Sequence, residues 1–284
     1  MKVVGVVIWY NPSNENIENI KNYIDDLEKL YIIDNSKENN LDKLKLDEKL
    51  KTKIVYVPLL KNKGIAYALN IGLEKGIEDN ADYILTLDQD SSFYKKEMLK
   101  EYFQLIENDE EQCALYGTST TAESKKEEEM PDFTEVGTLI TSGMMINLKK
   151  VNKLGKFKEE LFIDEVDIEY CYRALKFGEK IKKANNILLK HKIGNSKVYK
   201  IFGKRLTKVT HHNYIRRYYL IRNKLYMIQM FPEEQKAYKR RIRREVKNII
   251  LFENDKLRKL KMCWLAYRDF KAGKMGEIPN EYLK

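Results

Sequence analysis

Residues 85–93 read LTLDQDSSF, and this stretch decides the fold prediction. An apolar run ends in two carboxylates one residue apart, Asp88 and Asp90, which are followed by two serines. A short apolar run that ends at polar residues is typical of a strand buried on both faces of a parallel sheet. The stretch therefore predicts such a strand, with two acids at its carboxyl end.

The segments around this strand alternate between strand and helix patterns. The predicted elements are strands at 3–9, 30–33, 54–59 and 83–87, and helices at 17–27, 66–77 and 96–106. Strands that alternate with helices predict an α/β fold, with a mainly parallel sheet, flanking helices and right-handed crossovers. In such sheets a ligand binds beyond the carboxyl ends of the strands, so polar residues that follow different strands are expected to meet at one site.

Charge and periodicity divide the chain into two parts. After a strand pattern at 137–146 and a helix that begins near Asp164, the alternation stops at about residue 196, and the remainder predicts helices. Residues 190–284 contain 26 Lys and Arg and 8 Asp and Glu, which gives this part a net charge of +18. Because the whole chain has a net charge of +10, the preceding residues have a net charge of −8. We therefore expect a catalytic α/β domain at 1–195 and a basic, mainly helical extension at 196–284, which would attract polyanions.

Cysteine usage and hydropathy give expectations about location. Three widely spaced cysteines, Cys113, Cys171 and Cys263, fit a reducing compartment better than a disulfide framework or a metal site. No stretch approaches the ~18–20 apolar residues of a transmembrane helix, and the first apolar run is too short for a signal peptide. The sequence thus predicts a cytoplasmic protein.

Asp88-Gln89-Asp90 has four interpretations. The simplest is turn chemistry, because Asp and Ser often cap helices. A calcium hand is excluded, because loop position 6 would be Phe93 rather than Gly and position 12 would be Leu99 rather than Glu. A strand followed by D-x-D-x-S/T also presents the nucleophile of phosphatases related to haloacid dehalogenases, although these normally use their first strand. The fourth is a divalent cation shared with a substrate diphosphate, which would relieve the repulsion between the two carboxylates.

An ordered series of short motifs surrounds this pair of acids. The series is VVIWYNP, IIDNS, LKNKGIAYALNIGL, LTLDQDSS, TSGMMI and FIDEVDIEYCYRALKFG. In this order it resembles the family 2 inverting glycosyltransferases of the GT-A fold, a Rossmann-like α/β fold. The DQDS and FIDEVDIE motifs are similar to those of bacterial rhamnosyltransferases that build surface polysaccharides. The resemblance covers about residues 3–195, with a weaker match in HHNYIRRYYLIRNKL.

The resemblance implies a donor site and its metal. Asp34 would accept a hydrogen bond from a uracil or thymine ring. Asp90, the second acid of D-x-D, would contact Mn²⁺ or Mg²⁺, Asp88 would lie close to the ribose and the sugar, and His191 would contact the metal or the diphosphate. Gln89 departs from the Asp that is frequent at its position. The remaining residues expected to bind the nucleotide sugar are Tyr10, Asn11, Asn62, Lys63 and Gly64.

The resemblance also implies a catalytic base. Inversion needs one carboxylate within hydrogen-bond reach of the attacking hydroxyl. The family pattern, aligned on Glu169 and Arg173, puts this base at Asp167. Val166 stands where the pattern often has an acid, so Asp164, one helical turn earlier, is the second candidate. Alternatively, these acids only favour the start of a helix through its macrodipole.

The sequence thus favours a glycosyltransferase that moves a sugar, expected to be L-rhamnose, from a dTDP- or UDP-linked donor to a glycan acceptor in surface or capsular polysaccharide synthesis. Tyr238, Ile242, Val246 and Ile249 form an apolar stripe in a basic helix. This stripe fits either packing on the catalytic domain or peripheral contact with a membrane that holds a lipid-linked acceptor; nucleic acid ranks behind both. An aspartyl-nucleophile phosphatase and a noncatalytic, basic RNA- or membrane-binding protein stay open as alternatives.

Overall fold

The computed structural model describes residues 1–44, 47–120, 130–190, 196–201 and 204–283. The chain folds as two compact units, one made of residues 1–158 and 166–192, the other of residues 159–165 and 193–284. Each unit has a hydrophobic core of its own. The domain division made from the sequence stays a prediction, and it did not anticipate that the short segment 159–165 makes its contacts with the second unit.

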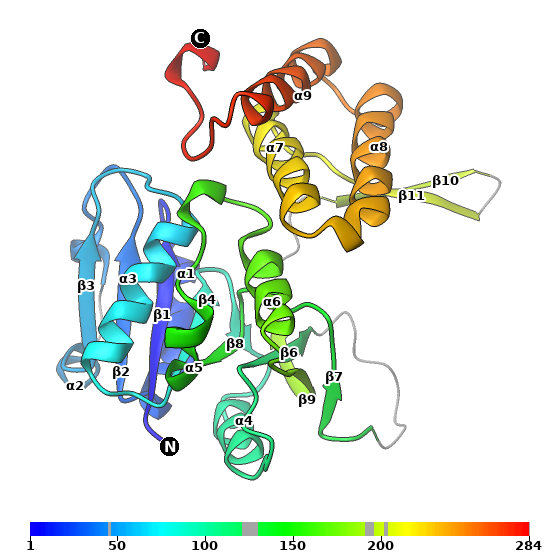
Figure 1. Cartoon of the computed structure of the whole chain (residues 1–284). Helices are drawn as coiled ribbons and strands as arrows, with labels where there is room; N and C mark the ends of the chain where they lie inside the picture. The colour runs from blue at the N-terminus through cyan, green and yellow to red at the C-terminus, as the bar shows by residue number, and fades with distance from the viewer. Residues whose placement is uncertain (45–46, 121–129, 191–195, 202–203, 284) are drawn as a thin grey trace. The chain divides into compact units, whose positions relative to one another are not determined.

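The sheet of the first unit is built on β1 (Val3–Trp9), whose seven residues are all buried (Figure 1). β1 pairs in parallel with β2 (Lys29–Asp34) on one side and with β4 (Tyr83–Asp88) on the other, and β3 (Ile54–Pro58) pairs in parallel with β2. These are the four strands that the apolar runs predicted. The α/β fold with a mainly parallel sheet is therefore confirmed.

Antiparallel pairings complete the sheet, and the sequence did not predict these pairings. β8 (Met144–Asn147) runs antiparallel to both β4 and β6 (Leu115–Thr120), and β6 pairs in parallel with β9 (Ile181–Lys190). Two short strands, β5 (Ser92–Phe93) and β7 (Phe133–Glu135), are antiparallel to β9. The strand predicted at 137–146 is wrong in its first part, because a turn at Gly143, with φ +81°, delays the strand to Met144.

Helices cover both faces of the sheet. Side chains alternate between the two faces along β1, so its valines show which helix lies on which face. Val3 and Val7 share a core with residues of α1 and α4, whereas Val6 faces α3 at Gly72, where a Cβ would lie 2.7 Å from the valine side chain. The helices of this unit are α1 (Asn14–Asn19), α2 (Glu48–Lys51), α3 (Ile65–Glu78), α4 (Met98–Glu107), α5 (Leu148–Leu154) and α6 (Val166–Lys176).

Two helix predictions need correction. The helix expected at 17–27 ends at Asn19 and continues as two 3₁₀ turns, although its apolar residues are buried as the spacing requires. The helix expected from Asp164 begins at Val166, because Asp164 and Glu165 both have φ +65°, a conformation that no α-helix of L-residues can contain.

The second unit contains α7 (Tyr214–Met230), α8 (Gln235–Phe252) and α9 (Lys256–Lys271), together with a hairpin of β10 (Ser196–Ile201) and β11 (Lys204–Thr210). No strand was predicted from the sequence in this mainly helical part; the runs KVY and TKVT of the hairpin are rich in β-branched and aromatic residues, which favour strands. The apolar stripe of α8 packs inside this unit, since Tyr238 and Ile249 are fully buried. Within the described residues, no helix has the length and apolar character needed to cross a membrane.

Candidate active site

The carboxyl ends of neighbouring strands bring the predicted polar residues to one edge of the sheet. Trp9 of β1 is level with Asp34 of β2, and Asp34 is level with Pro58 of β3. On the other side of β1, Ile8 is level with Asp88 of β4. The loops that follow these four strands carry most of the residues expected to bind the nucleotide sugar and the metal, so the pairing register itself groups them.

Gln89 joins the loop after β4 to the loop after β1. Its side-chain oxygen accepts a hydrogen bond from the Tyr10 N–H at 2.8 Å, and its Nε2 donates to the Tyr10 carbonyl at 3.3 Å. Its own carbonyl accepts from the amides of Asn16 and Asn19 at 3.2 and 3.0 Å. An aspartate could not donate to the Tyr10 carbonyl, because an ionised carboxylate is only an acceptor. The sequence showed that Gln89 replaces the Asp frequent at this position in the family. It did not show that Gln89 would bind the Tyr10 backbone.

Hydrogen bonds from neighbouring residues fix the carboxylate of Asp34. The side chain is 1% exposed, and its carboxylate accepts hydrogen bonds from the Ser36 N–H at 3.0 Å, the Asn40 amide at 2.8 Å and the Tyr56 hydroxyl at 2.5 Å. Burial acts to raise the pKa of Asp34, but these hydrogen bonds together outweigh it and hold the pKa below its ordinary value. The carboxylate is thus ionised and oriented, and its contact with a pyrimidine ring stays a prediction.

Two asparagines join the loops after β2 and β3. The Asn35 amide donates to the Asn62 side-chain oxygen at 3.1 Å, and the Asn35 oxygen accepts from the Lys63 N–H at 2.7 Å. The Asn62 oxygen also accepts from the N–H of Gly64, which has φ +88° and caps α3. Asn35 was not predicted as a site residue, because Asp-Asn-Ser alone reads as an ordinary turn. The pair fixes the backbone at the start of α3, where free N–H groups favour phosphate.

The turn Thr141–Gly143 contacts two of the predicted site acids, Asp88 and Asp167. The hydroxyl of Ser142 accepts a hydrogen bond from the Asp88 N–H at 3.4 Å. The N–H of its neighbour, Thr141, donates to Oδ2 of Asp167 at 3.1 Å. Two adjacent residues of one turn therefore contact the strand of the candidate metal site and the carboxylate of the first candidate base. The TSGMMI motif contains these residues, but the sequence predicted a strand there, and the contacts of the turn depend on the antiparallel pairing of β4 with β8.

The second candidate base, Asp164, has a different environment. Its carboxylate accepts hydrogen bonds from the Arg216 guanidinium at 2.9 and 3.2 Å, and its side chain is mostly buried. The amide of Asn223 donates to the carbonyls of Asp164 and Ile163 at 3.0 and 2.7 Å. These partners all belong to the second unit, whereas Asp167 and its partners belong to the first.

Glu169 and Arg173, on which the family pattern was aligned, form an ion pair within α6. The Arg173 guanidinium donates two hydrogen bonds to the fully buried Glu169 carboxylate, at 2.9 and 2.7 Å. The pair spans one helical turn, so the spacing of four residues in the motif has a structural cause. It stabilises the helix that carries Asp167.

Asp88 and Asp90 offer carboxylate oxygens at the end of β4, and both side chains are half-buried. Among the described residues, no group of three or more His, Cys, Asp or Glu side chains could hold a metal ion. Two carboxylates nevertheless fit Mg²⁺ or Mn²⁺, which prefer oxygen ligands and take the rest of their shell from water and substrate phosphates. His191, the third predicted ligand, lies outside the described residues.

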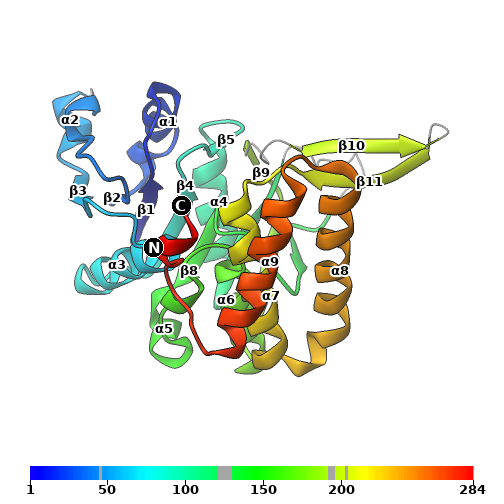
Figure 2. The same ribbon diagram turned by 90° about the horizontal axis from the view of Figure 1, so that it is seen from above.

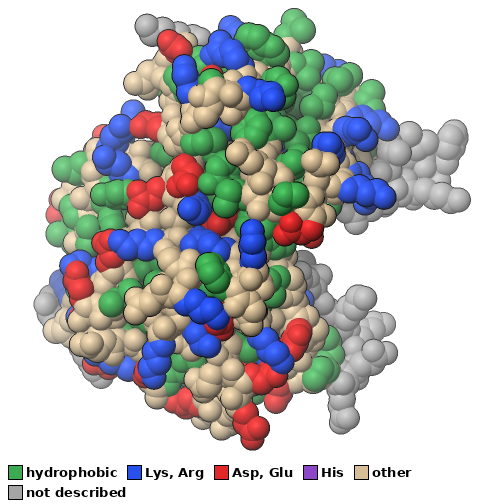
Figure 3. Space-filling view, in the orientation of Figure 1, with side chains coloured by type: hydrophobic (Ala, Val, Ile, Leu, Met, Phe, Trp, Pro, Cys, Tyr) green, Lys and Arg blue, Asp and Glu red, His purple; other side chains and the backbone are tan. Residues whose placement is uncertain are grey.

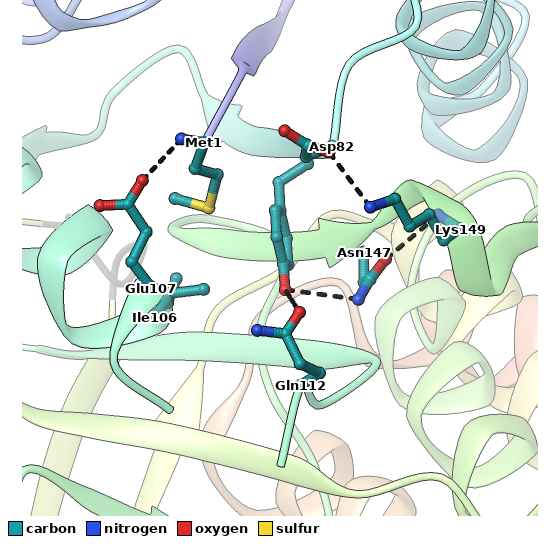
Figure 4. Close-up of a pocket in the computed structure, with 8 residues that line it drawn as sticks. Met1, Asp82, Ile106, Glu107, Gln112, Asn147 and Lys149 are labelled. Carbon is teal, nitrogen blue, oxygen red and sulfur yellow. Dashed lines mark hydrogen bonds and ion pairs between the residues drawn. The ribbon is translucent and has the colours of Figure 1, made fainter. Parts of the chain in front are cut away.

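A cavity of about 220 Å³ lies at the opposite edge of the sheet and is separate from this site (Figure 4). It is lined by residues next to the amino ends of β1 and β4, including Met1 and Asp82. Ion pairs join residues that line it, since the N-terminal amine contacts Glu107 at 2.6 Å and Lys149 contacts Asp82 at 3.4 Å. Ligands of α/β sheets bind at the carboxyl ends of strands, so we assign this cavity no catalytic role.

The family model described as glycosyl transferase family 2 matches residues 14–163, which include the strand that carries Asp88 and the turn at Thr141. The chain belongs to glycosyl transferase family 2. It is 28% identical over 244 residues to the dTDP-rhamnosyl transferase RfbF of Shigella flexneri, and the alignment covers 80% of each protein.

Two solved structures share the fold. One is the mannosyltransferase PcManGT from Pyrobaculum calidifontis in complex with GDP-Man and Mn²⁺, with a TM-score of 0.55 and 14% identity over 99% of this chain and 78% of that chain. The other is S. aureus TarS 1-349 in complex with UDP-GlcNAc, with a TM-score of 0.54 and 15% identity over 99% of this chain and 83% of that chain. The chain spans half the length of the longer TarS chain.

These findings confirm two predictions made from the sequence, the GT-A fold and membership of family 2, and the chain resembles a rhamnosyltransferase of that family. Membership of a transferase family argues against the phosphatase.

Proposed function

We propose that this glycosyltransferase moves L-rhamnose from dTDP-L-rhamnose to a glycan acceptor, with inversion at the anomeric carbon. The similarity to RfbF over 80% of both proteins supports the donor, and a UDP-linked sugar is the alternative. The acceptor is a lipid-linked glycan of a surface or capsular polysaccharide, extended at the inner face of the cell membrane. The donor occupies the carboxyl edge of the sheet, with Asp34 at the base, Tyr10 and Asn11 beside it, and Asn62, Lys63 and Gly64 lining the nucleotide.

Asp167 is the base of this reaction. The acceptor oxygen forms a bond to C1 of the sugar, the bond from C1 to the diphosphate breaks with its electron pair going to the diphosphate, and the acceptor proton passes to Asp167. The observation that carries the proposal is the turn at Thr141 and Ser142, which hydrogen-bonds both the Asp167 carboxylate and the Asp88 backbone. A base linked in this way to the donor strand is oriented before the acceptor arrives.

Asp90 and Asp88 hold Mn²⁺ or Mg²⁺ in this proposal, with the diphosphate of the donor and His191 as further contacts. When bound, the cation neutralises the charge that grows on the leaving nucleoside diphosphate. The two half-buried carboxylates at the end of β4 support this role. So does the Mn²⁺ in the complex of PcManGT, which has the same fold.

The test is calorimetric binding of dTDP, UDP, GDP and ADP to the purified protein, each with Mn²⁺ and again with excess chelator. We expect dTDP to bind most tightly and to lose its affinity in chelator. Transfer from dTDP-L-rhamnose to a synthetic acceptor, followed by NMR of the product, then reports the anomeric configuration. Metal-independent binding of all four nucleotides, or of none, would contradict the proposal.

A further inference from the structure

The outward face of α8 is strongly basic. Its exposed charged residues are all cations, namely Lys236, Lys239, Arg240, Arg243, Arg244 and Lys247. The helix contains one acid, Glu245, which is half-buried and paired with Arg217. The apolar stripe of the same helix faces inward, and Ile250 and Leu251 near its C-terminal end are 48% and 52% exposed, so α8 offers a partner mainly charge.

The outward face of α9 combines cations with large apolar side chains. Leu257 is 86% exposed, Trp264 is 59% exposed and Tyr267 is 50% exposed. Lys261 and Lys271 are exposed on the same side, at the helical spacing of Leu257 and Trp264. The one acid of α9, Asp269, is buried. Exposed apolar side chains that lie together and are bordered by polar residues mark contact sites for proteins or membranes.

The two faces belong to one surface of the second unit. α8 and α9 contact each other, and both pack on α7, whose residues 217–224 are all buried. The outward faces of α8 and α9 therefore point away from α7 (Figure 2). Figure 3 shows Lys and Arg side chains gathered along α8, with hydrophobic side chains exposed on the same unit. The linker between the helices adds one exposed acid, Asp255.

We propose that this α8–α9 face docks on an anionic membrane surface, with Leu257 and Trp264 inserted at the level of the headgroups and the cations of α8 against lipid phosphates. Tryptophan and tyrosine favour the membrane interface because their rings are amphipathic, and each Lys or Arg near an anionic leaflet strengthens partitioning about fivefold. Nucleic acid would use the cations and could stack on Trp264, but it gives no reason to expose Leu257. The proposal deepens the proposed function by naming the surface that would bring the enzyme to a lipid-linked acceptor.

Trp264 provides a direct readout in the full-length protein. The chain has two tryptophans, and the other, Trp9, is fully buried in the core of the first unit. Vesicles of phosphatidylcholine with about 30 mol % phosphatidylglycerol should shift the Trp264 emission to the blue, and brominated lipid should quench it. Pure phosphatidylcholine vesicles should bind at least about tenfold more weakly. An emission spectrum that anionic vesicles leave unchanged would overturn the proposal.

Variants separate the apolar contribution from the electrostatic one in vesicle sedimentation. Leu257→Ser should lower binding about tenfold even at about 0.5 M NaCl, where charges are screened. Arg240→Glu with Arg244→Glu should lower binding at least about 20-fold at about 0.1 M NaCl. Phe177→Ser is the matched control, because Phe177 is 48% exposed on the first unit and should leave binding unchanged.

Two outcomes count against the surface. Wild-type binding by both the Leu257 variant and the double arginine variant would overturn the proposal, as would tighter binding to poly(U) RNA than to anionic vesicles. All variants change exposed residues, and near-UV circular dichroism checks their fold. Vesicle binding is measured without donor, and metal-dependent dTDP binding is measured without vesicles, so a failure of docking and a failure of the proposed function are distinguishable.

Discussion

Asp167→Asn should abolish transfer while leaving donor binding and folding almost intact. A positioned base contributes about 10²- to 10⁴-fold to rate, which corresponds to about 2.7–5.5 kcal/mol of barrier. The asparagine keeps one oxygen that can accept the hydrogen bond now 3.1 Å from the Thr141 N–H. The other oxygen, which accepts from the Ile168 N–H at 2.9 Å, becomes an amide nitrogen that cannot accept, so the expected cost in folding free energy is about 1–2 kcal/mol. The kinetic loss should therefore exceed the loss of stability by about 1–4 kcal/mol.

Asp164→Asn is the matched control, one turn away in sequence. It loses the ion pair with Arg216, whose side chain is 45% exposed, so the expected cost in stability is about 0–1 kcal/mol. Transfer should stay within about fivefold of wild type. The assay measures product formation at saturating donor and acceptor, with dTDP affinity measured in parallel. Near-normal turnover of the Asp167 variant, together with collapse of the Asp164 variant, would refute the reasoning and move the base to Asp164.

Three further substitutions test the proposed metal site, the helix that carries the proposed base, and a titrating group. Asp90→Asn should weaken Mn²⁺-dependent dTDP binding at least about tenfold in calorimetry without lowering Tm, and unchanged affinity would remove Asp90 from the metal site. Glu169→Gln should cost about 3 kcal/mol or more in urea unfolding, because it leaves Arg173 without its buried carboxylate; a cost under about 1 kcal/mol would show that the pair is dispensable. Burial, followed by the nearby arginines, lowers the pKa of His212 to about 4. As pH drops, His212 is therefore protonated in the unfolded chain before it is protonated in the folded one. The free energy of unfolding should fall between about pH 6.5 and about pH 4 for this reason. His212→Gln should flatten this part of the Tm profile, whereas the exposed control His211→Gln should follow wild type.

The sequence predicted the strands around β1 well, because residues buried on both faces leave continuous apolar runs. The positions of Asp34 and Asp88 at one edge followed from those runs, since parallel strands in register end together. The pairing of β8 could not be predicted in this way. It joins residues about 60 positions apart, and its short apolar run is preceded by a turn that looks like part of the strand. The contacts of Thr141 and Ser142 depend on that pairing, so they could not be predicted from the sequence either.

Single side chains that link loops were also missed, for a related reason. Gln89 and Asn35 are polar residues in turns, and turn propensity alone explains their presence. Their partners, the Tyr10 backbone and the Asn62 amide, lie 79 and 27 residues away. In the second unit the apolar stripe of α8 gave the right amphipathic pattern, but a pattern cannot say which surface covers it. Burial of Tyr238 shows that the unit itself does.

The start of α6 shows why the sequence left two candidate bases open. Phe162, Asp164 and Glu165 all adopt left-handed backbone conformations, which cost about 1–3 kcal/mol each for residues other than glycine. The amide of Asn223 compensates by donating to the carbonyls of residues 161, 163 and 164 at 2.7–3.0 Å, across about 60 positions of sequence. A helix cannot include these residues, so it begins after them and Asp167 becomes its second residue. The placement of Asp167 on the helix and of Asp164 before it therefore depends on α7, which the local motif FIDEVDIE does not contain.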